Sequence, residues 1–252
     1  MFNFRNERYN RQVNMPEWGE ARQARLKGAH VAVIGAGGVK SSLLLCLAAG
    51  GIGRIDIIEF DRVELSNLNR QILYRTKDIG TLKGAAAQAT LHELNPEIDV
   101  RFHNARVDER NADRLLAGCS LVVEGGDSPD GRNLINRYCL SHEKPMVHCS
   151  AQFSYGYVFS MIPKQKTACF ACVFPDDHER KTSTGPVPVN GLSTMLAGTL
   201  GAAEVFKWFL GYEDFMSVNR KKCFNSLLMV GDFEDEDCPR NPACPVCSAH
   251  YR

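Results

Sequence analysis

The sequence has almost no net charge, since its 252 residues carry 30 Lys and Arg against 29 Asp and Glu. A chain so balanced gives no electrostatic reason to expect a nucleic acid or an acidic membrane surface as partner. The opening residues, MFNFRNERYNRQ, contain no apolar run of the signal-peptide type, so we expect no signal peptide. Internal repeats and low-complexity tracts are also lacking.

Long hydrophobic runs are lacking too. The most apolar stretch, residues 192–210, contains Glu204 and Lys207 and is rich in Gly, Ser and Thr, which predicts a buried helix rather than a membrane span. Apolar residues make up 44% of the chain and charged residues 23%, as in an ordinary globular protein. The length suffices for a sizeable core.

Cysteine, in contrast, is plentiful at ten residues. Four of them form two CxxC pairs, which together are typical of a closed, structural zinc site with four thiolates. The predicted ligands are Cys169, Cys172, Cys244 and Cys247. Most of the other six lie in apolar segments and are expected to be core residues. This usage leads us to expect reduced thiols and a cytoplasmic location.

From residue 30 onward, apolar strand patterns alternate with helical ones. Strands are expected at 30–35, 54–60, 98–107, 120–126 and 145–150, and helices at 39–51, 84–95, 111–119 and 132–143. This alternation predicts an α/β fold with a mostly parallel sheet and helices on both faces. Residues 1–28 read as a partly helical arm.

After residue 150 the pattern changes. Strands are expected at 153–162 and 222–233, with a long helix at 190–210 between them. No linker separates this half (151–252) from the nucleotide-binding half (29–150), so we expect a single domain over residues 1–252.

The segment AVIGAGGVKSSLL (32–44) places a glycine turn between a strand and a helix, which makes an anion site of backbone N–H groups. Gly35 and Gly37 fit a dinucleotide fingerprint, with Glu59 or Asp61 suited to a ribose hydroxyl, but Lys40 replaces the last glycine. A Walker loop is excluded because both of its glycines are missing. Lys40 is read as a solvent-facing helix residue or, alternatively, as a cation near the phosphates.

The crossover after residue 60 carries several polar residues, namely Asp61, Asn67, Arg70 and Lys83. A nucleoside triphosphate needs such cations, because its negative charge must be held and stabilised during transfer. Asp127 follows the fourth strand, where ligands bind in open α/β sheets, and its carboxylate suits Mg²⁺ shared with phosphate oxygens.

The motifs together resemble the E1-like adenylyltransferases, which include the ThiF, MoeB and HesA proteins and the ubiquitin-activating enzymes. The resemblance runs from about residue 8 to 247 and rests on RYNRQ, GAGGVKSS, FDRVELSNLNRQ, GTLK, EGGDSPDGRN, CFAC and RNPACPVC. It implies a Rossmann-like sheet with a C-terminal antiparallel extension that carries the zinc site. It also implies that ATP activates a carboxylate as an acyl-adenylate, with release of pyrophosphate.

The resemblance further implies a role for each matching residue. ATP would lie on Gly35, Gly37 and Gly38, with Asp61 at the ribose, Asn67, Arg70 and Lys83 at the phosphates, and Asp127 at magnesium. Arg11, in RYNRQ, would reach the phosphates from the partner subunit of a homodimer. The catalytic set is therefore Arg11, Arg70, Lys83 and Asp127.

Many relatives carry the acyl group or a persulfide on a cysteine in the loop that follows the first CxxC. Here that loop, residues 173–189, has no cysteine, and Ser183 and Thr184 are poor nucleophiles without an adjacent base. We therefore expect the adenylate to be handed to a separate thiol or sulfur-handling partner. Cys149 and Cys238 are read as a strand residue and a loop thiol rather than as substitutes.

Two substrates stay open, both in cofactor biosynthesis. One is the C-terminal Gly-Gly of a ubiquitin-like sulfur carrier, and the other is a small carboxylate such as the pyridinol precursor of the iron-guanylylpyridinol cofactor. The cysteine-free loop favours the small molecule without excluding the carrier. An NAD(P)-dependent oxidoreductase and a non-catalytic scaffold for a ubiquitin-like protein are the alternatives.

Overall fold

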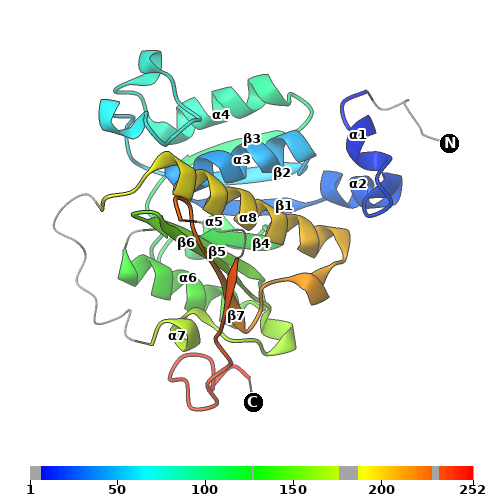
Figure 1. The fold of residues 1–252 in the computed structure, drawn as a ribbon, viewed down its shortest axis with the longest axis vertical. Helices are drawn as coiled ribbons and strands as arrows, with labels where there is room; N and C mark the ends of the chain where they lie inside the picture. Colours follow the sequence, from blue (N-terminus) through cyan, green and yellow to red (C-terminus); the bar gives the residue numbers. More distant parts are fainter. Residues whose placement is uncertain (1–6, 127, 176–186, 229–232, 252) are drawn as a thin grey trace.

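The computed structural model describes residues 7–126, 128–175, 187–228 and 233–251. Within these residues the strands form one sheet in the order β3-β2-β1-β4-β5-β6-β7-β8 (Figure 1). The strands are β1 (His30–Ile34), β2 (Arg54–Glu59), β3 (Asp99–Asn104), β4 (Leu121–Glu124), β5 (Met146–Gln152), β6 (Tyr155–Met161), β7 (Arg220–Asn225) and β8 (Glu234–Asp237).

Strands β1 to β5 are parallel to one another, as the alternating pattern predicts. The helices that follow β1 to β4 are α3 (Gly38–Gly50), α4 (Lys83–Leu94), α5 (Ala112–Leu116) and α6 (Pro129–Ser141). β1 lies between β2 and β4: the chain places β2 and β3 on one side of β1, and β4 and β5 on the other. Ligands of open α/β sheets bind at this switch point, beyond the carboxyl ends of the strands.

Strands β6, β7 and β8 extend the sheet in antiparallel pairs. Between β6 and β7 the chain forms α7 (Phe170–Val173) and the long helix α8 (Gly191–Leu210), which packs on α3 and β5. The remaining helical segments are α1 (Asn10–Val13), α2 (Gly19–Lys27), η1 (Leu65–Asn67), η2 (Thr76–Asp78), η3 (Pro163–Gln165) and η5 (Glu213–Phe215). Among the described residues, no helix is long and apolar enough to cross a membrane.

Alternate residues of the central strands face two separate hydrophobic cores. Val31 and Val33 of β1 belong to the core beneath α3, α4 and α8, whereas Ala32 belongs to the core beneath α5 and α6. Because side chains alternate along a strand, a strand covered by helices on both faces is apolar throughout. The prediction of helices on both faces is confirmed (Figure 1).

The C-terminal strands differ from the prediction at 222–233. β7 ends at Asn225, whose side-chain oxygen accepts the backbone N–H groups of Leu227 and Leu228 and so turns the chain. The acidic strand β8 was not predicted, because Glu and Asp have low strand propensity. It forms through cross-strand ion pairs with β7, including Lys222 with Asp235 at 2.7 Å.

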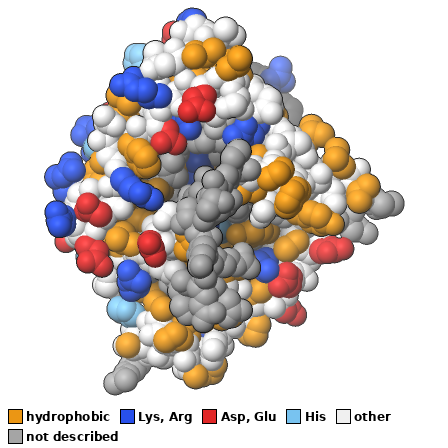
Figure 2. Space-filling view, turned by 90° about the vertical axis from the view of Figure 1, so that its left-hand side faces the viewer, with side chains coloured by type: hydrophobic (Ala, Val, Ile, Leu, Met, Phe, Trp, Pro, Cys, Tyr) orange, Lys and Arg blue, Asp and Glu red, His pale blue; other side chains and the backbone are white. Residues whose placement is uncertain are grey.

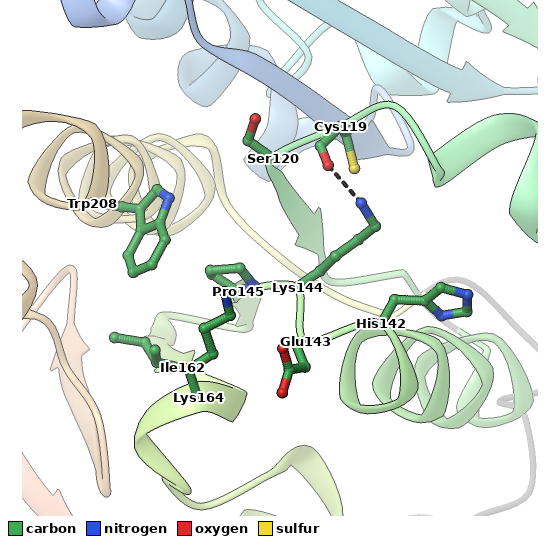
Figure 3. Close-up of a pocket in the computed structure, with 9 residues that line it drawn as sticks. All are labelled: Cys119, Ser120, His142, Glu143, Lys144, Pro145, Ile162, Lys164 and Trp208. Carbon is green, nitrogen blue, oxygen red and sulfur yellow. Dashed lines mark hydrogen bonds between the residues drawn. The ribbon is translucent and has the colours of Figure 1, made fainter.

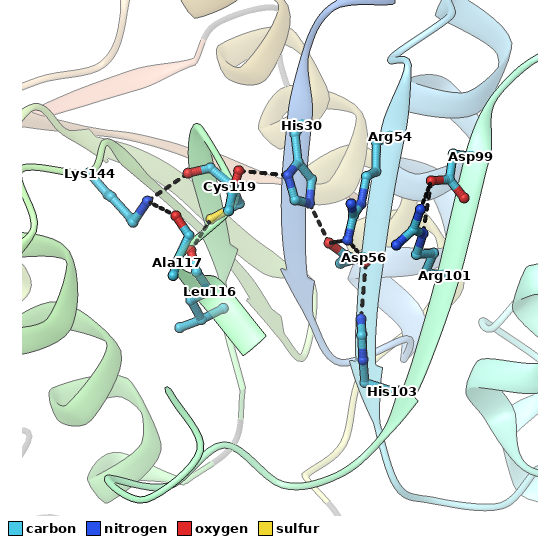
Figure 4. A network of polar contacts seen from close by, with 11 residues as sticks. His30, Arg54, Asp56, Asp99, Arg101, His103, Leu116, Ala117, Cys119 and Lys144 are labelled. Carbon is cyan, nitrogen blue, oxygen red and sulfur yellow. Dashed lines mark hydrogen bonds and ion pairs between the residues drawn. The ribbon is translucent and has the colours of Figure 1, made fainter. Parts of the chain in front are cut away.

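A buried carboxylate, Asp56, lies among two histidines and an arginine on the face of the sheet that α5 and α6 cover (Figure 4). It pairs with His30 of β1, with His103 of β3 at 3.0 Å, and with Arg54 at 3.0 Å. Burial opposes ionisation, but the hydrogen bonds from both histidines and the charges around Asp56 outweigh it and hold its pKa well below the usual range. This network joins the three strands on one side of the switch point.

Candidate active site

The glycine turn, Gly35–Gly38, connects β1 to the first turn of α3. The Gly35 amide donates to the Ile58 carbonyl at 2.8 Å, and the Ala36 amide donates to Glu59 Oε2 at 2.9 Å. Gly37 is the N-cap of α3, which runs for 13 residues. The turn is therefore anchored to β2, at the N-terminus of a helix, where an anion is stabilised by N–H groups and the helix dipole.

Two acids lie at the end of β2, Glu59 as its last residue and Asp61 just after it, and their side chains have different surroundings. Glu59 is buried, and its other oxygen accepts the backbone N–H groups of Phe60 and Asp61, so its carboxylate is occupied by the backbone. The Asp61 side chain is 53% exposed and pairs with Lys83 Nζ at 3.3 Å. Of the two sequence candidates, Asp61 is thus the acid available to a ribose, and it lies beside a predicted phosphate ligand.

The SNLNRQ segment brings Arg70 against the glycine turn. A Cβ atom on Gly38 would lie 3.3 Å from Arg70 Cγ and 3.0 Å from Thr194 Cγ2, so any other residue would have to push these side chains away. Arg70 Nη1 donates to the Ser66 carbonyl at 2.8 Å. Buried Asn67 accepts the Glu64 amide and fixes the start of η1. The structure thus brings Gly38 and Arg70 together, as it does Asp61 and Lys83.

Two residues near the turn were missed by the sequence analysis. Tyr74 donates its hydroxyl to the Ala36 carbonyl at 2.6 Å, and burial raises its pKa, so the phenol stays protonated. Gln71 is buried, its amide nitrogen lies near Gly37, and its Oε1 has no hydrogen-bond partner among the residues that the structure describes. Gln71 belongs to the motif already quoted, whereas no spacing signal identifies Tyr74.

Lys40 does not face solvent, so the sequence interpretation that favoured an exposed side chain is wrong. The residue is 3% exposed, and its ammonium donates to the Glu124 carbonyl at 3.1 Å and the Cys149 carbonyl at 3.4 Å. Cys149 Sγ lies 3.5 Å away. The side chain turns inward because the end of β4 and the middle of β5 present these carbonyl oxygens to the first turn of α3.

A buried polar chain, also unforeseen, continues from Glu124. Its Oε1 accepts the Gly126 amide at 2.7 Å, and its Oε2 pairs with His148 Nδ1 at 2.8 Å. Burial opposes ionisation, but the hydrogen bond to His148 lowers the pKa of Glu124, while burial lowers the pKa of His148. We infer a neutral imidazole with hydrogen on Nδ1, which leaves Nε2 to accept the Tyr157 hydroxyl at 3.2 Å.

Arg11 lies at the far end of α3 from the glycine turn. It is exposed on α1, where the neighbouring Gln12 donates to the Gly50 carbonyl at 2.9 Å. The 13 residues of α3 separate Gly50 from Gly38, about 20 Å at 1.5 Å per residue. Arg11 is therefore not among the residues that meet at the turn of its own chain. Asp127 lies outside the described residues, and so do Ser183 and Thr184.

The four predicted zinc ligands meet at one point. Their sulfur atoms all lie within 4.8 Å of one another, with Cys169–Cys244 at 3.8 Å and Cys172–Cys247 at 3.6 Å. A tetrahedral site with Zn–S bonds of about 2.3 Å has sulfur–sulfur edges of about 3.8 Å, which fits. The hydrogen bond from Cys169 lowers the pKa of Cys172 to about 5, so one thiolate is present at neutral pH.

The two cysteines considered as substitute nucleophiles are both buried. Cys149 is fully buried in β5, and burial raises the pKa of its thiol despite the nearby ammonium. Burial also raises the pKa of Cys238, beyond the end of β8. A buried thiol with a raised pKa is a poor nucleophile, in agreement with the interpretation of both as structural residues.

Figure 2 looks onto the face where the parallel strands end, with Lys and Arg side chains above and to the left of centre and hydrophobic side chains on the right. Apolar side chains are exposed on segments next to the N-terminus of α8, namely Phe153, Tyr155, Leu192, Leu227 and Leu228. A pocket of about 260 Å³ lined by Cys119, Lys144 and Trp208 lies instead where β4 and β5 begin (Figure 3).

Comparison with known proteins identifies the family. Residues 9–246 match the ThiF family. The chain belongs to the ThiF family. It is 35% identical to a sulfur carrier protein adenylyltransferase of Thermus thermophilus and 34% identical to the SAMP-activating enzyme E1 of Haloferax volcanii. These alignments cover 96% of this chain and 90% and 88% of the relatives.

Solved structures agree with this membership of the ThiF family. The fold matches E. coli MccB bound to MccA-N7isoASN with a TM-score of 0.85 at 25% identity, covering 97% of this chain and 75% of that one. It also matches E. coli MccB with ATP at a TM-score of 0.84, 26% identity, and coverage of 96% and 74%. The chain is an E1-like adenylyltransferase with a Rossmann-like fold, and its family uses ATP.

Proposed function

We propose that this ThiF-family chain activates the C-terminal carboxylate of a carrier protein or peptide with ATP. A carboxylate oxygen attacks the α-phosphorus, the bond from that phosphorus to the pyrophosphate oxygen breaks, and an acyl-adenylate and pyrophosphate result. Two contacts carry the proposal: Arg70 packs against Gly38 of the glycine turn, and the Asp61–Lys83 pair follows Glu59, which anchors that turn. The substrate carboxylate is already ionised at pH 7, so no protein base is required.

The side chains stabilise charge rather than move protons. Negative charge develops on the α-phosphate oxygens and the leaving pyrophosphate, and preorganised cations lower the barrier where that charge appears. Lys83 and Arg70 supply these cations, and Asp61 takes the ribose. Magnesium bound at Asp127 would add charge to the phosphates.

Two observations favour a protein or peptide substrate over a small carboxylate. The relatives named above are a sulfur carrier adenylyltransferase and a SAMP-activating enzyme, and MccB is solved with MccA. In this chain, Phe153 and Leu192 lie on segments joined by the hydrogen bond from Asn190 Nδ2 to the Phe153 carbonyl. Together with exposed Tyr155 they offer an apolar surface that a small acid would not need.

ATP–pyrophosphate exchange distinguishes the substrates. We expect exchange with ubiquitin-like carriers that end in Gly-Gly, and none with the same carriers lacking the last residue. Exchange with small cofactor-precursor carboxylates alone would instead support the second candidate, which the cysteine-free loop favours. Tight NAD binding without ATP binding in calorimetry would contradict the adenylylation proposal itself.

The same proposal includes a homodimer in which Arg11 acts on the site of the partner. The position of Arg11 at the opposite end of α3 from its own glycine turn supports this arrangement. Zinc at the four cysteines would hold α7 to the C-terminal residues, away from the glycine turn, and has a structural role in the proposal.

A further inference from the structure

The glycine turn and the end of β4 are joined by one side chain. Lys40 leaves the first turn of α3 and donates to carbonyl oxygens of β4 and β5. An ammonium has three N–H donors, and Glu124 O, Cys149 O and Cys149 Sγ lie within 3.5 Å of this one. The donors are therefore engaged by the protein, so Lys40 is not a free cation for phosphate.

Gly125, the residue after Glu124, leaves room for the Lys40 ammonium because it has no side chain. Gly125 has φ +149°, and a Cβ atom there would lie 2.5 Å from Lys40 Nζ and 2.2 Å from the Cys149 carbonyl oxygen. A side chain at position 125 would displace the ammonium and strain the backbone. Lys40 and Gly125 thus fit each other across two elements that are distant in sequence.

The segment Glu124–Gly126, here called the β4 turn, is held by three further interactions. Glu124 Oε1 accepts the Gly126 amide at 2.7 Å, and Arg132 Nη1 donates to the Gly126 carbonyl at 2.8 Å. His148 holds the other oxygen of Glu124. Lys40 adds a contact from α3 to these three interactions, and its positive charge balances the buried Glu124 carboxylate.

We propose that Lys40 is a positioning residue that locks the β4 turn to α3, so that the two turns on either side of the switch point keep one relative geometry. The proposal rests on the proposed function for its catalytic consequence, because Asp127 follows the β4 turn directly. The lock itself is independent of that function. Its loss leaves the glycine turn anchored to β2 but frees the β4 turn.

The direct test of the lock is amide hydrogen exchange on the Lys40→Met variant, without substrate. Lys40→Met keeps the length of the side chain and removes its charge and donors. We expect exchange at Gly126 to accelerate at least 10-fold, while Gly35, whose amide is held by β2, stays within 2-fold. Lys164→Met, the same change at an exposed lysine, should alter neither. Unchanged exchange at Gly126 overturns the proposal.

Kinetics test the consequence. In ATP–pyrophosphate exchange we expect kcat of Lys40→Met to fall at least 10-fold with KM for ATP within 3-fold, since the glycine turn still binds nucleotide. A purely structural role would lower the melting temperature and leave kcat of the folded fraction unchanged, which overturns the positioning role. If Lys40→Met does not fold, Lys40→Gln keeps N–H donors and is expected to show the same pattern at smaller amplitude.

Failure of the proposed function is distinguishable from failure of this inference. If the unmodified protein gives no ATP–pyrophosphate exchange with any carboxylate, the proposed function is wrong. Accelerated hydrogen exchange at the Gly126 amide of Lys40→Met would still support the lock. If the unmodified protein is active and Lys40→Met retains its kcat, the positioning role fails while the proposed function stands.

Discussion

Lys83 and Asp61 show how one crossover supplies two charges to the same place. Lys83 begins α4 and is largely buried, while Asp61 follows β2 and is exposed, and their side chains meet at 3.3 Å. The pair brings a cation and a hydrogen-bond acceptor next to Glu59, which anchors the glycine turn. The pairing also keeps the lysine ammonium in place before nucleotide arrives.

The first prediction concerns this cation. Lys83→Met should lower the rate of ATP–pyrophosphate exchange at least about 100-fold, because charge stabilisation by a preorganised donor contributes that much in comparable sites. Lys77→Met, an exposed lysine on the same crossover, is the matched control and should stay within about 2-fold. A fully active Lys83→Met would remove Lys83 from the catalytic set.

At the residue scale, the sequence predicts which residue types form the site better than it predicts where their side chains point. The structure brings Arg70 to Gly38 and Lys83 to Asp61, two contacts between residues of the predicted set, whose order along the crossover is fixed by the motif. The direction of Lys40 could not be predicted, since it depends on carbonyl groups 84 and 109 residues further along the chain. Glu124 and His148 were missed for the same reason.

At the element scale, the sequence predicts the parallel half of the fold because its central strands β1 and β4 are short apolar runs that alternate with helical patterns. It fails at β8, where Glu234 and its neighbours form a strand only because the cations of β7 lie opposite. The cluster of four cysteines is predictable from the spacing of the two CxxC pairs. Their meeting point is not, since it depends on how the chain after β8 returns to α7.

The Asp56 network gives a prediction on stability. Asp56→Asn should lower the free energy of unfolding at pH 7 by at least about 2 kcal/mol, because it removes a buried charge partner of two histidines and an arginine. The folded-state pKa of Asp56 is depressed, so its contribution is fully present above about pH 4 and is lost as the pH falls.

Urea unfolding at several pH values checks both parts of this prediction. The difference between the original protein and Asp56→Asn should be constant near neutral pH and shrink steadily below about pH 4. A difference that grows as the solution is acidified would show that the sign of the linkage is wrong. Asp99→Asn, an exposed carboxylate paired with Arg101 on β3, serves as the control and should change stability little.

The cysteine cluster gives a prediction on metal content. Metal analysis should find about one zinc per chain, and Cys247→Ser should lower both this content and the melting temperature, because thiolate–zinc bonds hold two distant segments together. Cys139→Ser, a buried cysteine outside the cluster, should keep the zinc. Purified protein with four free thiols and no metal would exclude the structural site.

At the scale of the whole molecule, the position of Arg11 at the far end of α3 from its own glycine turn supports the proposal that two subunits form the site. If Arg11 acts in trans, Arg11→Ala and Lys83→Met are each inactive alone, but their heterodimer contains one intact site. Random exchange of subunits in an equal mixture should then restore about one quarter of the original activity. A mixture as inactive as its components would show that Arg11 acts in its own chain or not at all.

The most direct measurement follows oxygen-18 from the carboxylate substrate. If its carboxylate attacks the α-phosphorus, hydrolysis of the acyl-adenylate at the carbonyl carbon leaves one oxygen-18 atom in AMP, and the released pyrophosphate carries none. The proposed function predicts this pattern, dependent on ATP and abolished in Lys83→Met. Label in inorganic phosphate, or unlabelled AMP while the substrate is consumed, would contradict it.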